Sequence, residues 1–264
     1  MLSQPLAEQV RVLAWSAQSV GMTRSHMEDS AFALTMQLLL PERPVTLGIY
    51  MVADGMGGHD NGEVASRLAV QTSVKALTET LILPLDQAGE SPSRQEVFAL
   101  LEAAFARAQA EVLLNVSGGG TTLTLALLLE KDLYFGHIGD SRLYLRSKST
   151  EFQALTQDHS LVRRLVDLGQ ISDQEAANHP QRNVLFRALG QTDGFKTDLG
   201  HYPLTEPTQL LLCTDGLWGL VEEEDLLNTI KAAKADGDIA QELCDLANQA
   251  GGTDNISVIF VEIK

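Results

Sequence analysis

The chain has 264 residues, of which 44% are apolar and 20% are charged, which is the composition of a folded globular protein. Its formal net charge of −16, from 19 basic and 35 acidic residues, argues against a nucleic-acid partner, which needs a basic surface. The longest apolar run, Leu123–Leu129, is too short to cross a bilayer. The N-terminal stretch MLSQPLAEQV has no long apolar core, so we expect neither a signal peptide nor a membrane partner. Two cysteines are too few for a disulfide framework and suit a cytoplasmic protein.

The first half of the chain is predicted to form strands followed by two helices. Strands are indicated over 10–17, 30–38 and 49–53. Helix-like spacing of apolar residues then runs from Asn61, which we expect to cap the helix, to about Leu81. The polar, proline-containing stretch 83–94 is predicted to be a surface loop. A second amphipathic helix follows Ser93, whose spacing to Glu96 is that of a capping box.

The second half begins with three apolar runs that we expect to pair as an antiparallel meander, at 121–129, 133–138 and 143–145. The stretch 156–200 interrupts this pattern because it is polar and helix-prone. Further strands are predicted at 209–214 and 256–263, with helices at 222–234 and 238–250. Because strands come in groups and helices in groups, the order predicts an α+β layered fold with an antiparallel sheet, built as a single domain over 1–264.

The segment 48–66, with the sequence GIYMVADGMGGHDNGEVAS, holds the first candidate site. Asp54 stands where the buried strand should end, and Gly55, Gly57 and Gly58 follow it directly. Glycine lets the backbone turn tightly or approach a ligand closely. A carboxylate at the end of a strand, on a glycine turn, is a common place to hold a hard metal ion, although an Asp-Gly pair alone is more often only a turn.

Acidic residues recur at the ends of other predicted strands. Asp215 follows the run LLLCT, Asp140 follows YFGHIG, and Asp254 comes just before ISVIFVEI. The pair Glu28 and Asp29 precedes SAFAL. If these strand ends meet at one edge of the sheets, the carboxylates cannot all stay ionised without cations. Because the chain has no suitable cluster of His and Cys, oxygen-preferring ions such as Mg²⁺ or Mn²⁺ are predicted.

Several short motifs, taken together and in order, resemble those of a known family. MVADGMGGH with NGEVAS, GDSRLY, LLLCTDGLW and GGTDNISVI look like the metal-dependent protein phosphatases, the type 2C serine/threonine phosphatases, in their compact bacterial form. The segment TRSHMED resembles the opening motif of the family, in which an arginine precedes an acidic pair. The resemblance extends from about Val12 to Ile263. It implies a four-layer αββα sandwich of two antiparallel sheets flanked by helices, with a binuclear metal centre at one end.

The resemblance also implies a role for each residue that matches a motif. Asp54 is expected to bridge two tightly bound Mg²⁺ or Mn²⁺ ions, and the backbone carbonyl of Gly55 to ligate one of them. Asp215 and Asp254 are expected to hold the other ion. These four positions form the core of the implied metal centre.

The remaining matches extend this centre toward the substrate. Glu28 and Asp29 are expected to act directly or through bound waters, and Asp140 matches the position that helps to bind a third, weaker metal ion. Arg24 matches the arginine that contacts the substrate phosphate. Its planar, permanently charged guanidinium suits phosphate oxygens on chemical grounds as well.

One position departs from the family pattern. Some members have a histidine in the motif DGHAG that is thought to protonate the leaving alcohol, and here that position is Met56, which cannot donate a proton. His59 and His159 are the candidate replacements, since histidine titrates in the right range. A histidine in a loop or on the surface is the commoner case, and a metal-bound water is a further alternative.

The stretch 156–200 corresponds to the flap that bacterial members place beside the site. Arg182 and Arg187, with the polar helices around them, are candidates for binding a phosphopeptide. We therefore expect this flap to influence which substrate is chosen.

Taken together, these features predict a metal-dependent serine/threonine phosphoprotein phosphatase that uses an activated water and no covalent intermediate. The expected partners are phosphorylated protein substrates, made by a bacterial serine/threonine kinase, and the enzyme is expected to be a cytoplasmic monomer. Two alternatives stay open. In the first, the chain is a catalytically weak relative that senses phosphoproteins. In the second, it is a different two-metal phosphohydrolase, such as a phosphodiesterase.

Overall fold

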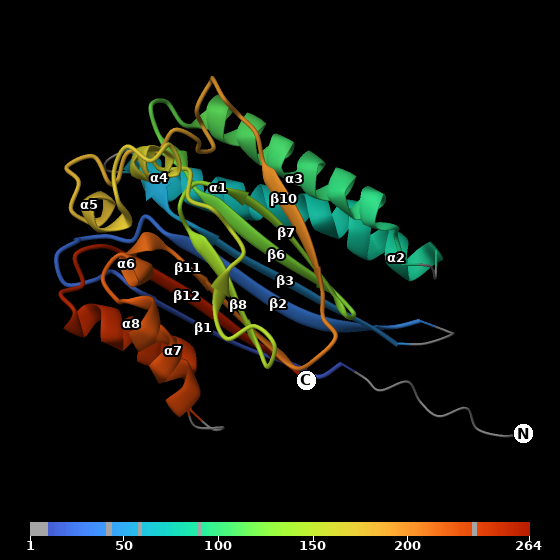
Figure 1. Cartoon of the computed structure of the whole chain (residues 1–264). Helices are drawn as coiled ribbons and strands as arrows, with labels where there is room; N and C mark the ends of the chain where they lie inside the picture. The colour runs from blue at the N-terminus through green and yellow to red at the C-terminus, as the bar shows by residue number, and fades with distance from the viewer. Residues whose placement is uncertain (1–9, 41–43, 58–59, 89–90, 234–236) are drawn as a thin grey trace, which may run out of the picture.

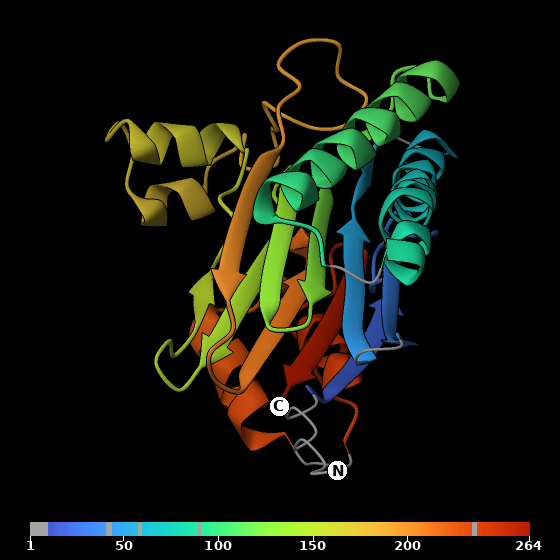
Figure 2. The same ribbon diagram turned by 90° about the vertical axis from the view of Figure 1, so that its right-hand side faces the viewer.

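The computed structural model describes residues 10–40, 44–57, 60–88, 91–233 and 237–264. Two five-stranded antiparallel sheets lie face to face between layers of helices (Figure 1, Figure 2). In order, the first sheet contains β1 (Val12–Ser19), β12 (Ile256–Ile263), β11 (Thr208–Cys213), β8 (Arg142–Ser147) and β9 (Gln153–Ala154). The second contains β10 (Asp198–Pro203), β7 (Asp132–Ile138), β6 (Leu123–Leu129), β3 (Pro44–Ala53) and β2 (Ser30–Leu39). A small ladder joins β4 (Gly55–Met56) to β5 (Gly120–Thr121).

Each sheet is covered on its outer face by helices, so the predicted four-layer αββα sandwich is confirmed. The second sheet carries α1 (Asp60–Leu77), the π-helical turn Thr78–Ile82, α2 (Leu83–Ala88) and α3 (Arg94–Asn115). The first sheet carries α6 (Asp215–Trp218), α7 (Glu223–Ala232) and α8 (Ile239–Gln249). Among the described residues, no helix is long and apolar enough to cross a membrane.

Strand β3 shows how the layers are held together. Tyr50 and Val52 face the other sheet, while Ile49 and Met51 face the helices α1 and α3. This alternation follows from the period of two residues along a strand. All four side chains are completely buried, because both faces of the strand are covered. A strand buried on both faces is apolar throughout, which is why this run was recognisable in the sequence.

The predicted three-stranded meander is wrong at its third strand. Strands β6 and β7 pair with each other, but β8 pairs with β11 and β9 in the other sheet. The chain crosses between the sheets at Gly139, whose φ of 111° is readily adopted only by glycine. Since both sheets bury apolar strands, a short apolar run does not indicate which sheet it joins. The crossing places Asp140 where the two sheets end.

Two local predictions near the first helix are also wrong. Asn61 lies inside α1, and its side-chain amide donates to the carbonyl of Ser117, 3.2 Å away, instead of capping the helix. Part of the predicted loop is helical, since α2 continues the path of α1 through a π-helical turn. Burial of Leu85 in the core beneath the helices explains why this segment stays folded onto the sheet.

The predicted flap ends earlier than expected, because Asp198–Pro203 is strand β10 at the edge of the second sheet. This strand contains glycine, histidine and proline and shows little apolar alternation, which is typical of an edge strand and hid it in the sequence. It pairs along its length with β7.

The flap itself is a loop with two short helices, α4 (Leu161–Asp167) and α5 (Asp173–Ala177), at one end of the sandwich (Figure 1). The two arms leading to it are joined by backbone hydrogen bonds. Leu161 donates to the carbonyl of Val184 over 2.7 Å, and Phe186 donates to the carbonyl of His159 over 2.9 Å. The flap is therefore attached to the sandwich by a paired stem.

Arg11, near the first described residue, meets the last residue, Lys264, at the opposite end of the sandwich. The backbones of Arg11 and Lys264 exchange two hydrogen bonds, each 2.8 Å long. Strand β12 begins beside the acidic motif GGTDN and ends next to this pair, which separates the two ends by roughly 23 Å at about 3.3 Å per residue.

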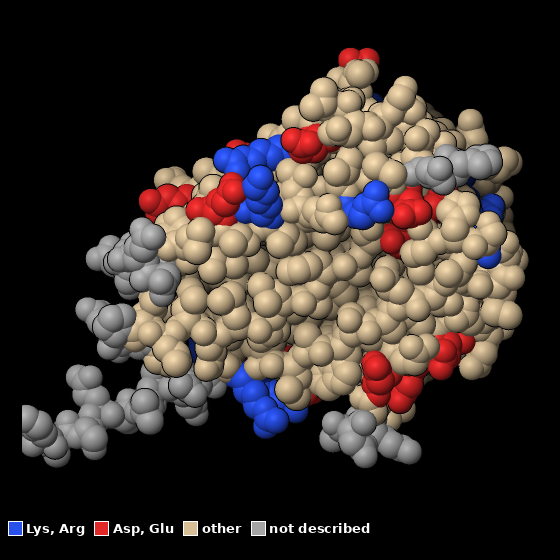
Figure 3. Space-filling model, turned by 180° about the vertical axis from the view of Figure 1, so that it is seen from behind, with Lys and Arg blue, Asp and Glu red and all other residues tan. Residues whose placement is uncertain are grey.

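Charged side chains are scattered over the face of the molecule drawn in Figure 3. Lysines and arginines there lie in small groups beside acidic residues, and this view shows no continuous basic patch among the described residues. The face accordingly lacks the basic footprint expected of a nucleic-acid interface.

We expect Ser93→Ala to lower the free energy of unfolding by about 1 kcal/mol, measured by urea denaturation. The predicted capping box is present: the Ser93 hydroxyl accepts from the backbone N–H of Glu96, whose carboxylate accepts from the backbone N–H of Ser93 over 2.7 Å. The control is Ser172→Ala, which removes the equivalent box of α5, a helix without buried residues. An equal loss in both variants would contradict this prediction.

Candidate metal centre

Five segments bring acidic residues to the end of the sandwich where the flap lies. Asp54 follows β3, Asp215 begins α6 after β11, and Asp140 lies in the crossing before β8. Asp254 precedes β12 and Asp29 precedes β2. Burial raises the pKa of Asp54 well above its ordinary value, and the other four carboxylates raise it further by repulsion. The five side chains therefore belong to one site.

The pKa values of three neighbouring aspartates are raised as well. Burial raises the pKa of Asp29 to about 7, with repulsion from Asp215 and Asp254 adding to it. Burial raises the pKa of Asp215 to about 6, again helped by Asp254. The pKa of Asp140 is raised by burial and by its neighbours Asp215 and Asp158. Such a group of carboxyl groups favours either bound protons or bound cations.

Two buried carboxylate oxygens point to a cation. One oxygen of Asp29 accepts from the hydroxyls of Thr214 and Ser257, both at 2.8 Å. Its other oxygen, Oδ1, and Oδ1 of Asp215 have no hydrogen-bond partner within the described part of the chain. A buried polar atom without a partner costs free energy, which a divalent cation would offset.

The donor set fits Mg²⁺ or Mn²⁺, because carboxylates and backbone carbonyls are the ligands that these ions prefer. The two cysteines are buried in the core between the first sheet and its helices, away from this role. In the residues that the structure describes, no three His, Cys, Asp or Glu side chains stand close enough together to form a finished ligand set.

Close backbone contacts hold the acidic segments against one another. A Cβ atom added to Gly55 would overlap the carbonyl oxygens of Gly62 and Glu28. A Cβ atom on Gly216 would likewise overlap the carbonyl oxygen of Asn255. Glycine is needed at both positions so that the Asp54 turn and the start of α6 can approach neighbouring segments closely.

The backbone of Asp54 is held by Thr121, the last residue of β5, and by Thr122, which lies between β5 and β6. Its N–H donates to the hydroxyl of Thr122 over 2.8 Å, and its carbonyl accepts from the hydroxyl of Thr121 over 2.9 Å. The Thr122 hydroxyl also shares a hydrogen bond of 2.7 Å with that of Ser141. The loop of Asp54 is thereby tied to the crossing that carries Asp140.

Arg24 and Glu28 lie beside the acidic cluster. The guanidinium of Arg24 forms an ion pair with Asp254 at 2.7 Å, while 47% of its side chain is exposed. Partial burial lowers the pKa of Arg24, but the hydrogen bond and charge of Asp254, helped by Glu28 and Asp54, raise it overall. The carboxylate of Glu28 is 3.1 Å from the ring of His26. Both predicted residues therefore reach the site, with Arg24 on its solvent side.

Asn255 is a site residue that sequence analysis missed. Its side-chain oxygen accepts from the backbone N–H of Glu28 over 2.6 Å. Its side-chain nitrogen donates to the carbonyls of Val20 and His26. Asn255 thus joins the segments that carry Glu28 and Asp254. The signal was present, since an asparagine directly follows Asp254, but asparagine in a turn rarely indicates a contact across the whole chain.

Of the two candidate proton donors, His159 is not brought to the acidic cluster. His59 lies outside the described residues. His159 is buried, its Nδ1 accepts from the backbone N–H of Gly139 over 3.1 Å, and its Nε2 contacts Asp198 at 3.0 Å. Burial lowers the pKa of His159. Through these contacts His159 joins the flap stem to the sandwich, so its role here is structural.

The two flap arginines are placed differently. Arg182 lines a cavity of about 350 Å³ whose wall also includes Asp140 and Asp215. Arg187 pairs with Asp198 at 3.0 Å and lines a separate cavity of about 320 Å³ with His159. Arg182 therefore shares a cavity with two members of the acidic cluster, whereas Arg187 lines a cavity beside the flap stem.

Comparison with known proteins places the chain in a family. Residues 42–249 match the family model described as protein phosphatase 2C. The chain is 37% identical over 242 residues to the serine/threonine phosphatase stp of Listeria welshimeri, which covers 92% of each chain. It is 33% identical over 220 residues to the protein phosphatase PhpP of Streptococcus pneumoniae, covering 81% of this chain and 85% of that one.

Solved structures agree with this assignment. The serine/threonine phosphatase of S. agalactiae superposes with a TM-score of 0.80 at 29% identity, over 95% of this chain and 99% of that one. The catalytic domain of the phosphatase PstP in complex with two manganese ions superposes with a TM-score of 0.76 at 30% identity, over 96% and 99% of the two chains. The chain belongs to the protein phosphatase 2C family. The predicted class of enzyme, a metal-dependent serine/threonine protein phosphatase, is confirmed.

In the presence of a chelator, we expect the melting temperature to fall by several degrees as the pH rises from about 5 to about 7. A carboxyl group whose pKa is raised by folding binds its proton more tightly in the folded state, so its stabilising effect is lost as the pH rises through the folded value. For Asp215 and Asp29 these values are about 6 and about 7. Calorimetric scans at several pH values measure this.

The control is the variant Asp29→Asn, in which part of this pH dependence should disappear. Saturating Mn²⁺ should remove the fall as well, since the cation replaces the protons. A melting temperature that rises over the same pH interval in the chelated wild-type protein would contradict the prediction.

Proposed function

We propose that this phosphatase hydrolyses phosphoserine and phosphothreonine monoesters in proteins at the acidic cluster, with Mg²⁺ or Mn²⁺ in two tight sites. The observation that carries the proposal is that burial and the carboxyl groups of four other segments raise the pKa of Asp54, while buried oxygens of Asp29 and Asp215 lack a partner among the described residues. The two manganese ions in the related PstP structure support the same number here.

The residues proposed to hold the two ions are Asp54, the backbone carbonyl of Gly55, Asp215, Asp254, Glu28 and Asp29. Asp54 is proposed as the shared ligand because the other acids surround it. When bound, the divalent ions would lower the pKa of a water bound to them toward neutrality, and they would offset negative charge on the phosphoryl oxygens.

Arg24 is proposed to bind the phosphate of the substrate. In the structure its guanidinium is paired with Asp254, and its exposure leaves it free to turn toward a ligand. A guanidinium donates two parallel hydrogen bonds to phosphate oxygens and stays charged at any physiological pH. If the guanidinium of Arg24 moved from Asp254 to the substrate phosphate, the carboxylate of Asp254 would become available to bind a cation.

Asp140 is proposed to support a third, weaker cation. It lies next to Asp215 and is 5% exposed, at the wall of the cavity under the flap. Protonation of the leaving alcohol is assigned to water in the site or to His59, because Met56 has no proton to give and His159 is engaged elsewhere.

The proposed substrates are proteins phosphorylated by a bacterial serine/threonine kinase, and the proposed setting is the cytoplasm, with the enzyme acting as a monomer. Arg182 is the flap residue proposed to contact the substrate, because it shares a cavity with Asp140 and Asp215. Arg187 is proposed to support the flap from behind, through Asp198.

We expect Asp54→Ala to reduce phosphate release from a phosphothreonine peptide in Mn²⁺ by about 100-fold or more, since it removes the shared ligand. Chelation of the wild-type enzyme should have the same effect. The control is Asp245→Ala, an exposed position on α8, which should leave activity unchanged. Activity that survives both chelation and Asp54→Ala would sink the proposal. A phosphodiester substrate measured in parallel distinguishes a phosphodiesterase.

For Asp140→Ala we expect slower turnover with the two tight Mn²⁺ sites retained. Isothermal titration calorimetry measures the tight sites directly, and steady-state kinetics over a range of Mn²⁺ concentrations measures the weaker one. Loss of the two tight sites in this variant would show that Asp140 has been assigned to the wrong ion.

A further inference from the structure

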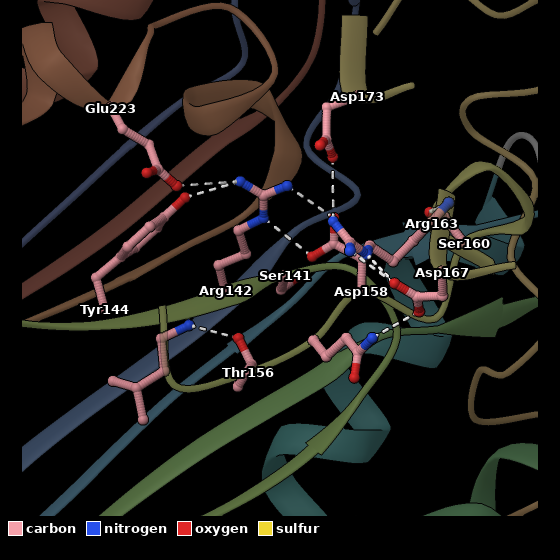
Figure 4. A network of polar contacts seen from close by, with 12 residues as sticks. Ser141, Arg142, Tyr144, Thr156, Asp158, Ser160, Arg163, Asp167, Asp173 and Glu223 are labelled. Atoms are coloured by element: carbon pink, nitrogen blue, oxygen red, sulfur yellow. Dashed lines mark hydrogen bonds and ion pairs between the residues drawn. The ribbon is translucent and has the colours of Figure 1, made fainter. Parts of the chain in front are cut away.

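Arg142, beside the acidic cluster, makes polar contacts with three other side chains (Figure 4). Its Nε and one terminal nitrogen donate to the two oxygens of Asp158 over 2.9 and 2.7 Å. The other terminal nitrogen donates to the hydroxyl of Tyr144 over 2.9 Å and lies 3.7 Å from the carboxylate of Glu223. The guanidinium also lies flat on Trp218, 3.6 Å from the ring centre.

These partners come from separate segments of the chain. Asp158 is in the arm that leads into the flap, directly before His159. Trp218 is the last residue of α6, the helix that begins with Asp215. Arg142 itself opens β8, two positions after Asp140. One side chain therefore connects the flap arm, the helix of one proposed ligand and the loop of another.

The same side chains form the wall of a cavity. The cavity of about 350 Å³ lies between α4 and α5 of the flap on one side and α6 and the start of α7 on the other. Arg142, Asp158 and Trp218 line it together with Asp140 and Asp215. Any movement of the flap arm away from α6 would change the width of this cavity beside the acidic cluster.

We propose that Arg142 is a positioning residue that holds the flap arm against α6 and thereby shapes the cavity in which the polypeptide of the substrate lies. The inference rests on the proposed function, because it takes the acidic cluster as the place where phosphate is removed. A small phosphate ester needs only the cluster and Arg24. A phosphorylated polypeptide also has to fit between the flap and α6.

The geometry requires arginine and not only a positive charge. The two parallel hydrogen bonds to Asp158 need the planar fork of a guanidinium, and the same plane stacks on Trp218. Lysine keeps the charge but offers neither feature. Asp158 is 8% exposed, so its pairing is protected from solvent. An exposed ion pair at this position would hold the arm less firmly.

The test compares two substrates in the full-length enzyme with Mn²⁺, p-nitrophenyl phosphate and a phosphothreonine peptide. We expect Arg142→Lys and Asp158→Asn each to raise KM for the peptide by about tenfold, the order of one lost charge-assisted hydrogen bond. KM for p-nitrophenyl phosphate should change by less than about twofold. The double variant should be no worse than either single one, because both remove the same contact.

The matched control is Arg146→Lys on the same strand, whose side chain donates to Gln209 over 2.6 Å and is absent from the cavity wall. It should change neither KM. Equal losses on both substrates, or effects that add in the double variant, would overturn the role of Arg142. If the wild-type enzyme releases phosphate from neither substrate in Mn²⁺, the proposed function fails instead, so the two outcomes are distinct.

Discussion

Carboxyl groups at one end of the sandwich repel one another where water screens them poorly, and the surrounding structure is what keeps them together. The strands deliver them there: Asp54 and Asp215 follow β3 and β11, and Asp29 and Asp254 precede β2 and β12. Three clusters of buried apolar side chains stabilise these strands: one lies between the two sheets, and one lies between each sheet and its helices. The free energy of that packing opposes the repulsion until cations offset it.

Asp54 and Glu28 are held through their backbones. Thr121 and Thr122 bind both polar groups of the Asp54 backbone, and Asn255 binds the backbone of Glu28. Gly55 and Gly216 allow the segments to touch without a side chain between them. This arrangement leaves carboxylate oxygens available for ligands while their positions along the chain stay constrained, which is how a rigid scaffold prepares a binding site.

Most of the site could be predicted from the sequence because its residues lie in short motifs at strand ends, where a local pattern indicates both the element and the acid. What could not be predicted depends on contacts between distant segments. The apolar run of β8 does not show which sheet it joins, and Asp198–Pro203 lacks the alternation of a strand. His159 was a candidate proton donor because histidine titrates near neutrality, yet its contacts with Gly139 and Asp198 decide its role.

The pairing of Arg11 with Lys264 lies at the far end of β12 from the acidic cluster. This separation indicates where the enzyme can be attached to another molecule or to a surface. A support, a dye or a fused carrier joined near either of these residues would stand on the opposite pole from the flap and its cavity. Large phosphorylated proteins could then approach an anchored enzyme as freely as they approach one in solution.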